Sequence, residues 1–416
     1  MPLVAPHGSA LEIHDGHSPR IMKPDLTDRL QKALSFCLLG WAFTLPISIA
    51  ATQFFAYPAS ILALILWIRT RDKSLLQSPL FFPALLFLLA AILASSFGVR
   101  PGYSLWRTRR LALFLPLIFA VTTVSRRHSS GPFVLRIGAF FLTGCTLRAI
   151  YDAIRIPAGA LRGEWIYGLG TMRDPQFYMV ALFIAFAAWR LPLSRKKRIA
   201  LLTAAVFCGV SFILHFKRGV WFSFAATLPL LALAARRVRP LLWLAVLAGL
   251  ALALPQTRGR LQSLQTEFSV RKGGRWTLWT EVAPVLIRQH PMGMGISAVT
   301  NEDFRRVSKQ MEPKLNHLHN NVLQVLLETG WIGLTAWLVW MTAVLRLMVR
   351  NVRGFSKEKV LPRMMAIAIL SSFLGLMLNG LVEYNFGDSE IFMLLCLAMG
   401  ASDALRVPDD EQSLSV

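Results

Sequence analysis

Long apolar runs, separated by short polar stretches, constrain the fold of this chain more than any other feature. Twelve of them approach or reach the length of about 20 residues that an α-helix needs to cross a bilayer. They lie at residues 33–51, 54–68, 80–97, 111–124, 133–151, 177–191, 199–216, 220–235, 241–254, 322–349, 361–382 and 391–405. Because a helix closes its backbone hydrogen bonds within one segment, we predict an all-α polytopic membrane protein with about 12 transmembrane helices.

The composition agrees with this fold class and excludes several functions. Hydrophobic residues make up 55% of the chain and charged residues only 16%, which lies outside the range of ordinary soluble domains. The formal net charge of +23 comes from basic residues that punctuate the apolar runs, so we predict membrane lipids or phosphate groups as partners and no nucleic acid. All four cysteines lie inside apolar runs without paired spacing, which argues against redox chemistry.

Basic residues between the runs predict the orientation in the membrane. The segments 69–73, 126–127, 195–198, 236–239 and 350–363 are all basic, which places them on the cytoplasmic side. An even number of spans then puts both polar ends in the cytoplasm, as a disordered tail at 1–32 and a short tail at 406–416.

The opposite face carries more cations than this topology favours. It holds Arg100, Arg107, Arg109, Arg110, Arg162, Arg173, Lys217, Arg218, Arg258, Arg260, Arg271, Lys272 and Arg275. Since the rule for membrane topology disfavours them there, we predict that some of these side chains bind an anion. The longest segment on this face, 255–321, is too long for a connector without structure.

A surface helix is predicted inside that segment. Trp276, Trp279, Ala283 and Leu286 recur at helical spacing. The tryptophans suit the headgroup depth of a bilayer, so we predict an amphipathic helix lying on the membrane. The alternative is an ordinary packed helix outside the membrane.

Two arginines are the candidates for anion binding. Arg218, beside Lys217, lies in a short predicted turn between two apolar runs, where a planar guanidinium suits a phosphate. The alternative is a cation at a helix end that reaches the interface. Arg275 opens the predicted surface helix, where a cation opposes the helix dipole but a bound anion would be stabilised. A solvated surface arginine is the alternative there.

Two histidines are the candidates for proton transfer. His317 and His319 precede Asn320 and Asn321, which can cap the helix that starts near Val322. The positive potential at a helix start favours a neutral imidazole, which is the form that a general base needs. The alternatives are a pair of metal ligands and an inert pair beside the cap. No third ligand at a recognised spacing accompanies the pair, so we predict no metal.

Carboxylates and further arginines are weaker candidates. Glu383 and Asp388 occupy the predicted outer turn between the last two runs, where they can orient an arginine or a sugar hydroxyl or simply be solvated. Arg173 and the group at 107–110 are predicted to be loop or interface residues. The chain has no P-loop, GxSxG or HExxH motif, and no Asp-x-Asp in its outer loops, so we predict no cofactor.

Several of these motifs together resemble the O-antigen ligase family of lipopolysaccharide assembly. The likeness extends over the hydrophobic chain from Ala33 onward, and its specific part lies between residues 217 and 330. The motifs are Lys217-Arg218-Gly219, Arg275-xxx-Trp279 ahead of Pro291-Met292-Gly293-Met294-Gly295, and His319-Asn320-x-x-Leu323-Gln324-x-x-x-Glu328-x-Gly330.

The resemblance implies the helical membrane fold of the C-type glycosyltransferases. Residues 33–405 would form the transmembrane catalytic domain and 255–321 its periplasmic loop, with the active site on the periplasmic side of the bacterial inner membrane. The implied reaction needs neither metal nor cofactor. It moves O-antigen polysaccharide from undecaprenyl diphosphate to a sugar hydroxyl of lipid A-core and inverts the anomeric centre.

By this analogy Arg218 and Arg275 hold the diphosphate, and His319 deprotonates the acceptor hydroxyl. Secondary candidates are His317, Lys217, Asp388, Glu383 and Arg173. O-antigen polymerases and protein O-oligosaccharyltransferases share the pattern and remain alternatives. A lipid-oligosaccharide transporter is the alternative of a different class, although the runs offer few polar residues beyond Arg148.

Overall fold

The computed structural model describes residues 25–71, 75–125, 130–164, 170–234, 239–259, 261–262, 274–313, 315–356 and 358–406, and all regular structure within these ranges is helical. Each predicted apolar run except the first falls on one helix. These helices are α1 (Leu26–Thr44), α2 (Ile49–Thr70), α3 (Phe81–Phe97), α4 (Pro101–Ser125), α5 (Ser130–Leu161), α7 (Asp174–Ala188), α8 (Arg195–Leu214), α9 (Arg218–Ala234), α10 (Arg239–Ala253), α15 (Asn321–Gly354), α16 (Val360–Asn379) and α17 (Ser389–Ala404).

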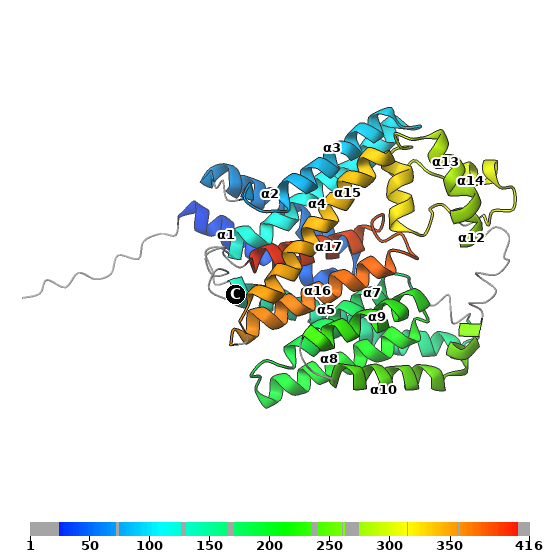
Figure 1. Cartoon of the computed structure of the whole chain (residues 1–416). Helices are drawn as coiled ribbons and strands as arrows, with labels where there is room; N and C mark the ends of the chain where they lie inside the picture. Colours follow the sequence, from blue (N-terminus) through cyan, green and yellow to red (C-terminus); the bar gives the residue numbers. More distant parts are fainter. Residues whose placement is uncertain are drawn as a thin grey trace, which may run out of the picture.

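The helices form an elongated bundle whose outer surface suits a bilayer (Figure 1). Among the described residues, α2, α4, α5, α8, α15 and α16 are long and apolar enough to cross a membrane, and α3, α7 and α9 are shorter apolar helices. Apolar side chains also point outward, since Phe54, Ile68, Phe97 and Leu233 are each 72–76% exposed. A polytopic helical membrane protein is therefore confirmed in its general character, while a count of about 12 crossings stays a prediction.

The first predicted span has the wrong bounds. The apolar run 33–51 bridges two helices, because the chain turns between Thr44 and Ile49, where Pro46 cannot continue the helical hydrogen bonds. Helix α1 also begins at Leu26, inside the segment assigned to a disordered tail at 1–32. That assignment is wrong for residues 26–32. Residues 1–24 lie outside the described part of the chain.

Other predictions also fall outside the described residues. They concern the basic residues Lys73, Arg126, Arg127, Arg236, Arg237, Arg260, Arg271, Lys272 and Lys357, and nearly all of the tail at 406–416.

Helix packing brings the last two helices into the middle of the bundle. Helix α16 packs against α7 and α9, α17 packs against α4, and α15 packs against α3. Trp41 and Trp340 are fully buried, and Phe386, in the turn after α16, stacks edge-on against Phe87 of α3 and Trp340 of α15. This packing fixes the α16–α17 turn, residues 380–388, beside the first residues of α15.

The outer segment 274–313 folds around a small core of its own. It contains α12 (Arg275–Thr277), the π-helical turn η2 (Leu278–Val282), α13 (Ala283–Gln289) and α14 (Asn301–Val307). Leu278, Val282 and Phe304 are fully buried in this second core. Helices α12 to α14 lie at the end of the bundle opposite the C-terminus (Figure 1). The prediction that this segment is not a structureless connector is confirmed.

The predicted surface helix is interrupted by the π-helical turn η2 (Leu278–Val282). Ala283 and Leu286 are buried together with Leu278 and Val282, whereas Trp276 is 53% exposed. An exposed Trp276 agrees with the expectation that the tryptophans lie at headgroup depth. The position of this helix on a membrane surface stays a prediction.

Helix α15 is broken at Gly330 and completed by the outer segment. Gly330 has φ +66°, a left-handed conformation that favours glycine, and the first part of the helix (yellow) stands at an angle to its long remainder (Figure 1). The carbonyls of Leu327 and Glu328 accept hydrogen bonds of 2.9 Å from the amides of Met294 and Gly295. The outer segment therefore supplies hydrogen-bond donors for the two helix carbonyls at the break.

Candidate functional site

The turn before α9 is held against the end of α16. Helix α8 ends at Leu214, Phe216 takes a left-handed conformation with φ +53°, and Arg218 begins α9 with only 8% exposure. A Cβ added at Gly219 would lie 3.0 Å from Val382 and 3.1 Å from Asn379. The small residue after Arg218 therefore allows close approach of the two segments.

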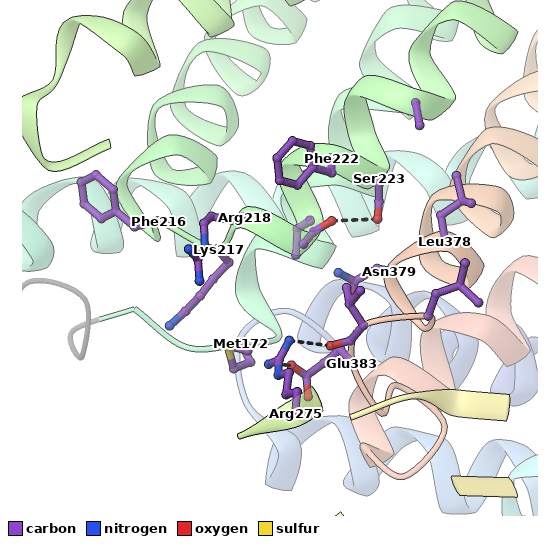
Figure 2. A pocket seen from close by; sticks show the side chains of 15 residues that line it. Met172, Phe216, Lys217, Arg218, Phe222, Ser223, Arg275, Leu378, Asn379 and Glu383 are labelled. Atoms are coloured by element: carbon purple, nitrogen blue, oxygen red, sulfur yellow. Dashed lines mark hydrogen bonds and ion pairs between the residues drawn. The ribbon is translucent and has the colours of Figure 1, made fainter. Parts of the chain in front are cut away.

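The structure brings Arg218 and Arg275 together, because both line one pocket of about 350 Å³. The side chains come from the α8–α9 turn, the start of α12 and the α16–α17 turn (Figure 2). Lys217 and Glu383 add further charges. The rest of the wall is mostly apolar and includes Phe216, Val220, Phe222, Ala226, Leu378, Leu381 and Val382.

Arg275 is fixed in this pocket by two contacts. Its Nη1 donates to the carbonyl of Val382 at 2.7 Å, and its Nη2 lies 3.0 Å from Oε2 of Glu383 (Figure 2). The side chain is still 32% exposed. The guanidinium is thus oriented by the α16–α17 turn and keeps part of its surface toward the pocket.

Glu383 connects Arg275 to His319. Its Oε1 lies 2.7 Å from Nδ1 of His319, while its Oε2 contacts Arg275. The His319 and Glu383 side chains are 14% and 13% exposed. A proton on Nδ1 would be donated to the carboxylate and leave Nε2 as an acceptor. This arrangement is that of a general base with an orienting carboxylate.

The backbone at His319 is unusual and locally anchored. His319 has φ +48°, a conformation that is uncommon for residues other than glycine. The preceding residue, Leu318, accepts a hydrogen bond of 2.7 Å from Nε1 of Trp279 and donates one of 2.7 Å to Oε1 of Gln324. Because these two hydrogen bonds fix Leu318, the strained conformation of the next residue, His319, is held in place.

The predicted cap on α15 is confirmed and also fixes the site. Asn320 Oδ1 accepts a hydrogen bond of 3.0 Å from the amide of Leu323. Its Nδ2 donates to the carbonyl of Leu381 at 2.9 Å, and the amide of Asn321 donates to the carbonyl of Gly380 at 2.7 Å. Two hydrogen bonds thus tie the histidine segment to the turn that carries Glu383.

Electrostatics keeps Glu383 ionised. Burial alone would raise its pKa, but the hydrogen bond from His319 and the charges of His319 and Arg275 lower the pKa to about 2. Burial, together with the charge of His319, lowers the pKa of His317 to about 4. At neutral pH the site therefore holds a carboxylate opposite His319 and a neutral His317.

A second, larger cavity adjoins the arginine pocket. Its volume is about 820 Å³. Met172 and Glu383 line both this cavity and the smaller pocket. The structure therefore brings all the candidate side chains to two neighbouring cavities. Those that line the larger one are Arg173, His317, His319, Glu383 and Asp388.

Arg173 and Asp388 have structural partners. Arg173 pairs with Glu390 and lies 3.6 Å from Asp174. Asp388 caps α17, because its Oδ1 accepts hydrogen bonds of 3.0 and 3.1 Å from the amides of Glu390 and Ile391. Both residues stabilise the cavity wall in the structure.

A buried charge cluster lies directly behind the α8–α9 turn and was not predicted. Arg148 Nη2 lies 2.8 Å from Asp174, Tyr178 donates a 2.6 Å hydrogen bond to Asp152, and His215 Nε2 lies 3.5 Å from Asp152. Asp152 and Asp174 lie just outside the predicted runs 133–151 and 177–191, so the expectation that these runs hold few polar residues beyond Arg148 is not contradicted by them. The spacing of Arg148 and Asp152, one helical turn apart, was the available signal.

Among the residues that the structure describes, two groups of side chains have a geometry that could hold a metal ion. They are His317 with His319 and Glu383, and Asp152 with Asp174 and His215. In space Glu383 supplies the third ligand that spacing along the chain did not reveal. Both of its oxygens are engaged, however, and Arg275 lies beside it, so a cation there would face a guanidinium. A cation held by Asp152, Asp174 and His215 would likewise face the guanidinium of Arg148.

Comparison with known families agrees with the geometry. A sequence model of a family described as O-antigen ligase matches residues 172–338. The matched stretch contains Arg218, Arg275 and His319, and the resemblance to this family is confirmed. No curated protein matched the chain. The match supports a bacterial membrane enzyme of the ligase or polymerase type, which transfers lipid-linked polysaccharide.

Proposed function

We propose, from the likeness to the O-antigen ligase family, that this chain is the ligase that completes lipopolysaccharide. It moves O-antigen polysaccharide from undecaprenyl diphosphate to a sugar hydroxyl of lipid A-core on the periplasmic face of the inner membrane. The observation that supports the proposal best is the contact of Glu383 with both Arg275 and His319. It joins an anion pocket to a general base.

The smaller pocket suits the donor lipid. A diphosphate carries several negative charges, and two guanidinium groups with Lys217 offer charge-assisted hydrogen bonds to them. The apolar wall formed by α9 and α16 suits a prenyl chain. One pocket therefore offers a cationic surface for the diphosphate and an apolar surface for the prenyl chain.

The reaction follows as a single displacement that inverts the anomeric centre. The acceptor oxygen forms a bond to the anomeric carbon while the bond from that carbon to the diphosphate oxygen breaks. His319 Nε2 takes the hydroxyl proton, and Glu383 stabilises the imidazolium that results. Arg218 and Arg275 stabilise the negative charge that builds up on the leaving diphosphate. No metal takes part in these steps.

Purified protein supplied with alternative acceptors tests the proposal. The protein, in detergent, is incubated with O-antigen on undecaprenyl diphosphate and either lipid A-core or a second lipid-linked oligosaccharide, and the products are separated on a gel. Ligated lipopolysaccharide supports the proposal. Elongated carrier-linked chains without ligation would instead identify a polymerase, glycosylated protein an O-oligosaccharyltransferase, and no covalent product a transporter.

A chelator is expected to leave transfer unchanged. The positive charges of Arg218 and Arg275 can neutralise the diphosphate, which a metal ion would otherwise have to do. The initial rate of ligation with and without EDTA measures this. A loss of activity that Zn²⁺ or Mg²⁺ restores would contradict the metal-free mechanism and require a metal site at one of the two candidate groups.

Glu383→Gln is expected to lower kcat about a hundredfold or more, because an amide keeps the shape but no longer stabilises a charged His319. Its matched control is Asp388→Asn, which lines the same cavity and retains a side chain that caps a helix. We expect the control to stay within a few-fold of the wild-type rate. The opposite ranking of the two variants in initial-rate measurements would move the catalytic carboxylate to Asp388.

A further inference from the structure

The larger cavity extends from His319 to a cationic wall formed by the first turns of α4 and the residue before it. Arg100, Tyr103 and Arg107 line this wall. The cavity of about 820 Å³ lies in the range of roughly 300–1,000 Å³ that is typical of pockets enclosing small ligands. The donor diphosphate is assigned to the smaller pocket, so this wall faces the space from which an acceptor would approach His319.

The two arginines of this wall differ from Arg173, the third arginine of the cavity. Arg173 is paired with Glu390. Among the described residues neither Arg100 nor Arg107 forms an ion pair, and the buried Nε of Arg107 has no hydrogen-bond partner. Arg107 also borders a void of about 40 Å³. A donor group with space beside it is what an anion site requires.

Glu328 is a carboxylate that lines the same cavity. Glu328 lies close enough for its charge to interact with Arg107, but its two oxygens already accept hydrogen bonds of 2.9 Å from Gln324 and 2.8 Å from Tyr384. Tyr103 presents its ring to the guanidinium of Arg107 at 5.9 Å, which leaves the in-plane N–H groups available.

We propose that Arg100 and Arg107 bind an anionic group, a phosphate or a carboxylate, on the acceptor saccharide, and that the ring of Tyr103 packs against the adjoining sugar. The proposal rests on the proposed function, because it assigns the acceptor to the cavity that contains His319. A charge-assisted, bidentate contact at one end of the cavity would fix the acceptor so that its hydroxyl reaches Nε2.

Modified acceptors test this in the wild-type protein. Lipid A-core is used as purified, after phosphatase treatment, and after chemical reduction of its carboxyl groups. We expect one of the two treatments to raise KM for the acceptor about 10-fold to 100-fold and to leave the affinity for the donor unchanged. Unchanged KM after both treatments would overturn the proposal while ligation itself still supports the proposed function.

Binding without turnover separates the two proposals further. Calorimetry with the deacylated core oligosaccharide, native and treated, reports the anion contact even if no ligation is observed. Weaker binding after removal of the anionic group supports the cationic wall, and equal binding contradicts it.

A pair of arginine variants localises the contact. Arg107→Gln is expected to abolish the difference between native and treated acceptors, whereas Arg109→Gln should preserve it. Arg109 lies on the same helix, but it is exposed and its guanidinium lies 4.0 Å from the ring centroid of Trp106. Arg100→Gln, at an exposed position, repeats the test if Arg107→Gln does not fold. Equal losses in the Arg107 and Arg109 variants would overturn the proposal.

Discussion

His319→Ala is expected to reduce ligation by about 10²-fold to 10⁴-fold, the range that a positioned general base contributes. The side chain is removed from a segment that Trp279 and Asn320 hold independently of the imidazole, so expression and binding of the carrier lipid should persist. Initial rates of ligation at saturating donor and acceptor measure the loss, and the affinity for undecaprenyl diphosphate is measured separately.

His317→Ala is the matched control. The two imidazole rings lie 3.9 Å apart and line the same cavity, yet only His319 contacts Glu383 through a hydrogen bond. The pKa of His317, about 4, means that this group titrates well below neutral pH. We expect its removal to cost less than about tenfold in rate. Comparable losses in both variants would contradict the assignment of the base.

Arg218→Ala is expected to lower kcat by about 10²-fold to 10³-fold, because the guanidinium stabilises charge that develops only as the diphosphate leaves. Arg218→Lys should recover part of the rate, since it restores the positive charge without the planar fork. Single-turnover rates with lipid-linked donor separate this effect on chemistry from any effect on donor affinity.

Arg258→Ala controls for loss of charge on the outer face. Arg258 is exposed and donates a hydrogen bond to the carbonyl of Leu252, away from the residues that line the anion pocket. A rate near that of the wild type is expected. If this variant slowed ligation as much as Arg218→Ala does, the effect would be a general one on surface potential, and Arg218 would lose its assignment.

Hydropathy predicted much of the architecture. Apart from the first run, which bridges two helices, each apolar run lies on one helix, because burial of an apolar segment depends mainly on its composition. Arg218, Arg275 and His319 were selected by motif resemblance and line two neighbouring cavities, and their roles stay predictions. The cap by Asn320 followed from local hydrogen-bonding chemistry, which acts over only three residues and is therefore visible in a sequence.

Features that depend on contacts between distant segments were not predictable in the same way. Hydropathy does not reveal the break at Pro46 inside an apolar run or the π-helical turn at Leu278–Val282. Asp152 and Asp174 belong to different helices, so their joint contact with Arg148 needs the packed bundle. The double contact of Glu383 likewise joins residues that are 64 and 108 positions away in the chain.

The hydrogen bonds at the Gly330 break hold the outer segment against α15, so we expect this segment to stay in place and not to open as a hinge. Swinging residues 291–295 away from α15 would leave the carbonyls of Leu327 and Glu328 without partners, at a cost of about 1–3 kcal/mol each. We therefore expect substrates to enter and leave without that motion. The carrier lipid would enter from the bilayer along α9 and α16, and the sugar next to its diphosphate would lie in the cavity beside His319.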